Sequence, residues 1–107
     1  MRPVTVTATG VAVSAPVVLD QYQGPFNVGL GVKVGAGCTC KVEHTFDDPF
    51  AATFDPSTAV WFDHASLKAL AANADGNYAF PVRAIRLNQS AGAATSTLVV
   101  LQAGVKG

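Results

Sequence analysis

An unbroken alternation of apolar with small or polar residues runs from Phe26 to Val34. In an extended strand successive side chains point to opposite faces, so a period of two places one row in a core and the other row outside. The pattern returns from Cys38 onward, where the inward row ends in His44 and Phe46. Apolar rows with this period cannot be buried on one side of a helix, so we expect stacked antiparallel sheets.

Short clusters rich in Gly, Pro, Asp and Asn separate the apolar runs along the chain. Gly10 is predicted to mark a bulge or a bend in the first run, and Gly35–Gly37 is predicted to close a hairpin. The segment 64–72 alone is rich in helix formers, and we expect one short helix there. The prediction is an all-β antiparallel β-sandwich, jelly-roll-like or Ig-like, of about six to eight short strands.

The charge balance excludes several classes of partner. Only 13% of the residues are charged, and seven basic residues offset seven acidic ones. We therefore expect no nucleic-acid partner, because no basic surface is available to neutralise phosphates.

The apolar runs end before the roughly 20 residues of a membrane-spanning helix, and the start Met1-Arg2-Pro3 lacks the apolar region of a secretory signal, so we expect no membrane partner. The 107 residues are predicted to form one domain (1–107), with residues 1–15 as a candidate extended or exchanged strand.

The residues that carry chemistry do not form a recognisable site. Cys38 and Cys40 share one strand face, about 6.5 to 7 Å apart at Cα, at the limit of disulfide geometry, so we expect two buried free thiols. His44 and His64 lie near acidic residues, but these sit on opposite strand faces or in turns. We therefore expect no catalytic residue, no metal ligand and no cofactor. The acidic residues concerned are Glu43, Asp47, Asp48 and Asp63.

Three features suit contacts with another protein. The outward row of the alternating strand 26–34 is nearly bare of side chains, so a partner backbone can approach it closely. The long loop 47–58 carries aromatic residues, which we expect to pack against the end of the sandwich. Two arginines near the C-terminal end alternate with apolar residues and suit ion pairs or interface anchors. The candidate interface residues are Asn27, Gly29, Gly31, Phe50, Phe54, Arg83 and Arg86.

Five short segments, one before the middle of the chain and four in its second half, carry a family resemblance. They are Val42–Asp48, Trp61–His64, Ala71–Tyr78, Phe80–Asn88 and Leu98–Gly104. In this order they resemble small virion structural proteins of tailed bacteriophages and prophages, over residues 40 to 104. The resemblance implies a β-rich, non-enzymatic protein that is present in many copies in the virion, on the head or the tail.

The preferred function under this resemblance is that of a capsid decoration protein. Its partner would be the major capsid protein, and it would form homo-oligomers; a neck or tail component is the alternative. Two other classes remain open. A carbohydrate-binding sandwich module would use exposed Trp61 or Tyr78 as a stacking platform, although we expect Trp61 in the core. A small metal-dependent hydrolase would need His44 and His64 to converge on an ion.

Overall fold

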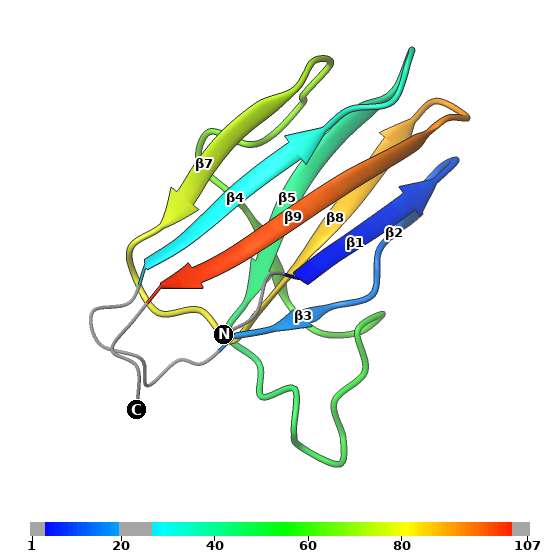
Figure 1. Cartoon of the computed structure of the whole chain (residues 1–107). Coiled ribbons are helices and arrows are strands. Elements are labelled where there is room, and N and C mark those ends of the chain that lie inside the picture. The colour runs from blue at the N-terminus through cyan, green and yellow to red at the C-terminus, as the bar shows by residue number, and fades with distance from the viewer. Residues whose placement is uncertain (1–3, 20–26, 104–107) are drawn as a thin grey trace.

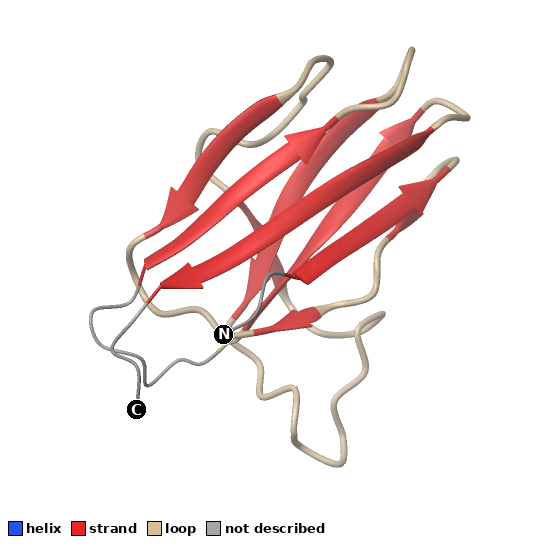
Figure 2. Ribbon diagram, viewed as in Figure 1, coloured by secondary structure: helices blue, strands red, loops and turns tan. Residues whose placement is uncertain are grey.

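The computed structural model describes residues 4–19 and 27–103, which form two antiparallel sheets packed face to face (Figure 1). These residues contain strands and loops and no helix (Figure 2). The sheet nearer the viewer in Figure 1, here the front sheet, has the order β1 (Val4–Thr9), β9 (Thr95–Ala103), β4 (Asn27–Lys33), β7 (Ala74–Tyr78). The rear sheet has the order β2 (Ala12–Val13), β8 (Ala84–Ala91), β5 (Thr39–Thr45), β6 (Trp61–Asp63), and β3 (Val17–Val18) also pairs with β8.

The strand order identifies the type of sandwich. β2 and β3 both pair with β8 and together occupy one position beside it. With these two strands counted as one interrupted strand, the two sheet orders have the connectivity of a jelly roll. The predicted all-β antiparallel sandwich is confirmed, and the topology decides between the two variants that the alternation left open.

Glycines occupy several points where the chain passes between the sheets. Gly10, with φ 69°, leads from β1 to β2, so the predicted bend is confirmed. Gly92, with φ 102°, joins β8 to β9, and a Cβ there would lie 2.6 Å from the Cys38 sulfur. The hairpin predicted at Gly35–Gly37 is wrong, because β4 pairs with β9 and β7 whereas β5 lies in the other sheet.

The helix predicted at 64–72 is also wrong. Instead of forming helical backbone bonds, this segment forms backbone hydrogen bonds with β5 beyond the end of β6. Leu70 and Cys40 exchange two backbone hydrogen bonds of 2.7 and 2.9 Å, and the Val42 amide donates to the Leu67 carbonyl at 2.8 Å. These bonds pair the backbone N–H and C=O groups at the edge of β5, and they hold Leu67 in a buried position. Tertiary pairing therefore outweighs the local helix propensity.

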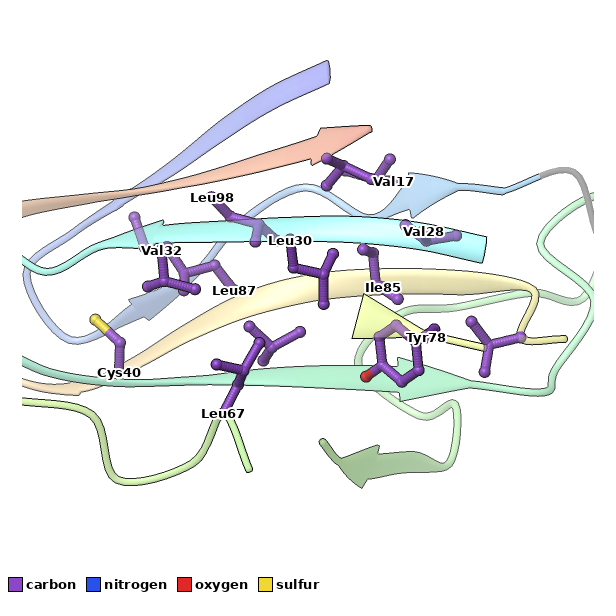
Figure 3. Packing of buried hydrophobic residues seen from close by; sticks show 14 of the residues in the cluster. Val17, Val28, Leu30, Val32, Cys40, Leu67, Tyr78, Ile85, Leu87 and Leu98 are labelled. Atoms are coloured by element: carbon purple, nitrogen blue, oxygen red, sulfur yellow. The ribbon is translucent and has the colours of Figure 1, made fainter. Parts of the chain in front are cut away.

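An apolar core fills the space between the sheets (Figure 3). The inward row of β4 is buried as the alternation predicts, and both cysteines are buried and free, which confirms that prediction. β5, β8 and β9 supply inward rows from the two sheets. The core includes Val28, Leu30, Val32, Cys40, Val42, Ile85, Leu87, Leu98 and Val100.

Candidate protein-binding site

His44 stands at the centre of an aromatic cluster at one edge of the sandwich. β5 places it in the inward row, and the strand register pairs it with Phe62 of β6. Its Nδ1 shares a hydrogen bond of 2.8 Å with the hydroxyl of Tyr78, the last residue of β7. The bond therefore joins β7, the outer strand of the front sheet, to β5, the strand next to the outer strand β6 of the rear sheet.

Three phenylalanine rings surround the imidazole of His44. Phe46 and Phe80 meet it edge-on, with ring centroids 5.5 and 5.7 Å away, and Phe62 stacks on it at 5.8 Å. The three side chains remain 49%, 50% and 47% exposed, respectively, for Phe46, Phe80 and Phe62. We call these three residues, together with His44, the aromatic patch. Its rings come from the end of β5, from β6 and from the β7–β8 connection, so only the fold brings them together.

The patch contains one polar side-chain atom without a partner among the described residues. This atom is His44 Nε2, because the hydrogen bond of His44 to Tyr78 uses Nδ1. Burial lowers the pKa of His44 below its ordinary value, and the nearby His64 lowers it further. At neutral pH the patch is therefore an uncharged surface, apolar except for one ring nitrogen, and suits an apolar partner.

A polar network covers the outer face of the rear sheet beside the patch. Arg86 forms an ion pair of 2.9 Å with Glu43, and its guanidinium lies 4.1 Å from the centre of the Trp61 ring. The Pro56 carbonyl accepts hydrogen bonds from Trp61 Nε1 and Arg86 Nη1, at 2.9 and 3.2 Å. The loop 47–58, which contains Pro56, thus covers this face and buries Glu43 and Thr45, two of the outward residues of β5. Trp61 is half-buried under Arg86, so its predicted place in the core is wrong.

The two histidines lie against the same Tyr78 ring, with centroids 4.9 Å (His44) and 4.8 Å (His64) away. His64 Nε2 donates to the Asn77 carbonyl at 2.8 Å, and its Nδ1 accepts from the amide of Leu67 at 3.1 Å. Both ring nitrogens of His64 therefore form hydrogen bonds that stabilise the local backbone. Within residues 4–19 and 27–103, no three His, Cys, Asp or Glu side chains gather as a metal site.

The first group of predicted interface residues lies on the outer face of the front sheet. Asn27 and Gly29 are exposed and Gly31 is half-exposed, in the row opposite the buried residues of β4. Among the described residues nothing covers Gly31, because a Cβ there would meet no atom within 4 Å. The group lies on β4 and is separate from the aromatic patch.

The second group lies around the loop that follows β5. Phe50 is 82% exposed and does not pack on the sandwich, contrary to expectation, because the Asp48 carboxylate accepts its amide and closes a tight turn. Phe54 is half-buried. Arg83 pairs with Asp48 at 3.6 Å, and Arg86 belongs to the network under the loop. The structure does not bring this group together with Asn27, Gly29 and Gly31.

The aromatic patch was missed by the sequence analysis. The alternation placed Phe46 in the buried row, but it follows the last residue of β5 and lies at the margin of the sheet. No local spacing connects Phe46, Phe62 and Phe80, because strand pairing and the β7–β8 connection join them. A run of several exposed apolar residues in one segment would have given a signal, and the chain has none at these positions.

Comparison with known protein families, with curated proteins and with solved structures finds no match to this chain. The described residues include no helix of the length and apolar character that a bilayer crossing requires. Function must therefore be inferred from the residues and geometry described above.

Proposed function

We propose that the protein is a non-enzymatic structural subunit of a tailed-phage virion, a capsid decoration protein that binds the major capsid protein. The observation that carries this proposal is the aromatic patch, in which three half-exposed phenylalanines each contact the imidazole of one histidine. A contiguous apolar patch of this kind on a protein surface is often a functional contact surface, and aromatic residues are enriched in protein–protein interfaces.

The patch is held in one arrangement before any partner arrives. Tyr78, which is 1% exposed, anchors His44 by its hydroxyl, and the three rings pack on that fixed imidazole. A half-exposed phenylalanine leaves roughly 100 Å² uncovered. Covering three such rings at ~25 cal/mol/Å² supplies about 7 kcal/mol before the costs of association. Preorganisation lowers those costs, and many copies on a lattice multiply a modest affinity.

The segments that carry the family resemblance are also those that build the patch. Phe46, Phe62 and Phe80 each lie within one of the five segments, and so do His44 and Tyr78. The jelly roll is an architecture of viral capsid proteins and of lectins, which is compatible with the proposal but does not by itself identify a function. The shared segments and the jelly-roll architecture favour a contact within a virus particle.

The test is incorporation into purified virions, measured by quantitative mass spectrometry. Hundreds of copies per particle are expected for a decoration protein. Phe62→Ser should strongly reduce the copy number, because it removes the ring that stacks on His44. Leu101→Ser is the matched comparison, since Leu101 is 50% exposed on the other sheet, opposite Gly29. Full incorporation of this variant is expected, and a loss with Leu101→Ser instead of Phe62→Ser would assign the contact to the front sheet.

Each alternative gives a different result. A dozen copies or fewer would indicate a neck or tail component. If Phe50→Ser abolishes incorporation and Phe62→Ser does not, the contact lies on the loop and the patch is not the binding surface. Absence of the protein from virions would overturn the proposal. A carbohydrate-binding module is not favoured, because Tyr78 is buried and Arg86 covers a face of Trp61.

A further inference from the structure

β1 is an outer strand of the front sheet with a free edge (Figure 1). The Gly10 amide donates to the Ala94 carbonyl in the β1–β9 register. Because bonded pairs alternate in an antiparallel ladder, the even-numbered residues of β1 bond to β9. Thr5, Thr7 and Thr9 therefore direct their N–H and C=O groups away from β9, toward the open edge.

This edge lacks the usual protection against strand pairing. No charged residue occurs between Val4 and Leu19, and β1 itself contains no proline. Natural sheets normally block such edges with charges, prolines or bulges. On the same side of the sandwich Val11, Val13 and Val18 are 73%, 47% and 40% exposed. The edge is thus both unpaired and apolar within the described residues.

The sequence of β1 is nearly symmetric about Thr7. Residues 5–9 are Thr-Val-Thr-Ala-Thr, so a second β1 in antiparallel orientation sets Thr7 opposite Thr7 and Thr5 opposite Thr9. In this register, the residues of one copy whose backbone N–H and C=O groups point to the open edge lie opposite the same kind of residues of the other copy. A register centred on Val6 would place Thr9 opposite Pro3, which has no amide hydrogen. The symmetry favours a second copy of this chain, through a twofold contact, over an unrelated strand.

We propose that two copies pair antiparallel along β1, centred on Thr7, and join their four-stranded front sheets into one sheet of eight strands. This pairing deepens the proposed assembly role by naming a partner, and for its biological purpose it rests on that role. Its geometry depends only on β1. Because β1 and the aromatic patch lie at opposite edges of the sandwich, one contact leaves the other accessible.

Disulfide trapping tests the register directly. Across a hydrogen-bonded antiparallel pair the Cα atoms are about 5.5 Å apart, within the range that a disulfide spans. Thr7→Cys should therefore form a covalent dimer under mild oxidation, while the native Cys38 and Cys40 are buried and do not compete. Thr97→Cys is the matched control, because Thr97 is opposite Thr7 in register but lies on the inner strand β9. Equal cross-linking of both variants, or of neither, would overturn the proposal.

A second pair of variants tests the backbone contact by sedimentation velocity. Thr7→Pro removes an amide that points to the open edge and leaves the bonds to β9 intact, so it should raise the dissociation constant at least tenfold. Thr7→Val keeps the amide and should dimerise like the original chain. If circular dichroism shows that Thr7→Pro is unfolded, Thr7→Lys replaces it, because it sets two like charges together at the twofold axis. Unchanged association of the folded proline or lysine variant would overturn the proposal.

The same variants separate this inference from the proposed function. A chain that never dimerises but enters virions in full number overturns β1 pairing and supports the particle role. A chain that dimerises through Thr7 but is absent from virions supports β1 pairing and overturns the particle role.

Discussion

Gln89 joins three parts of the chain from a fully buried position in β8. Its Nε2 donates to the carbonyls of Gly10 and Ala94, at 2.8 and 2.7 Å. Its Oε1 accepts a hydrogen bond from the Ser96 hydroxyl. Gly10 follows β1 and Ala94 precedes β9, where the chain passes between the sheets, and Ser96 lies at the start of β9. One amide therefore satisfies the polar groups that both crossings bring into the interior.

Gln89→Met should lower the free energy of unfolding by about 2 to 4 kcal/mol, because it keeps the volume but leaves the Gly10 carbonyl without the Gln89 donor and the buried Ser96 hydroxyl without its acceptor. Urea denaturation measures the loss. Asn88→Met is the matched control: its amide donates to Glu43 on the half-buried outer face, and we expect a loss of at most about 1 kcal/mol. Equal losses in the two variants would contradict a special role for Gln89.

His44 should make stability depend on pH in the acidic range. Its pKa is lowered from 6.5 by burial and by His64. As the pH falls below 6.5, His44 takes up a proton in the unfolded chain but remains neutral in the folded chain, so the free energy of unfolding decreases. The contribution is fully restored above the unfolded pKa. His44→Gln keeps a hydrogen-bonding group for Tyr78 and cannot titrate, so its stability should vary less between about pH 5 and 8. The free energy of unfolding is measured by urea denaturation at several pH values. The same pH dependence in the variant and in the original chain would refute this prediction.

At the scale of elements, the segment that follows β6 is held by packing against β7. Leu67 is 1% exposed, and a Cβ on Gly76 of β7 would lie 2.9 Å from its Cδ1. The close approach of these two residues lets Leu67 enter the core, while its carbonyl bonds to Val42 of β5. The segment thus extends the edge of the rear sheet without being a regular strand.

A double-mutant cycle tests this packing. Leu67→Ala should cost about 2 to 4 kcal/mol through the cavity that it leaves. Gly76→Ala should cost about 1 to 3 kcal/mol in the original chain by overpacking, and clearly less in the Leu67→Ala background, where its methyl group has space. Additive losses in thermal or urea unfolding would show that the two residues do not press on each other.

At the scale of the whole molecule, the two proposed contacts lie at opposite edges of the sandwich. β1 and β2 form one edge of the two sheets, and β7 and β6, with the aromatic patch, form the other. Under the two proposals, a second copy would bind at one edge and a capsid protein at the other. A dimer would then present two patches, which strengthens attachment through effective concentration without any new contact.

The molecule should also lose stability at alkaline pH. Burial raises the pKa of Tyr78 and of Cys40, and the hydrogen bond with Asp63 raises that of Lys41. Above the ordinary values of 9.0 for Cys40, 10.0 for Tyr78 and 10.5 for Lys41, the unfolded chain releases protons that the folded chain retains. The free energy of unfolding should therefore fall as the pH rises above about 9. Tyr78→Phe should show a shallower decline above pH 10, and a flat profile in the original chain would contradict the prediction.

The sequence alone determined the class of fold, because side-chain alternation is a local property of a strand. The inward row of β4, the bend at Gly10 and the buried free thiols all follow from period two, glycine chemistry and strand geometry. The positions of Asn27, Gly29 and Gly31 on an outer face follow in the same way. None of these inferences required knowledge of which strand pairs with which.

Only the tertiary structure decided the rest, because it depends on contacts between distant segments. Segment 64–72 is not helical since the edge of β5 accepts its backbone bonds. β4 and β5 separate because Gly35–Gly37 crosses between sheets, and Trp61 is half-buried because Arg86 and Pro56 reach it from elsewhere in the chain. The aromatic patch and the free edge of β1 likewise arise from sheet order, which local periodicity does not encode.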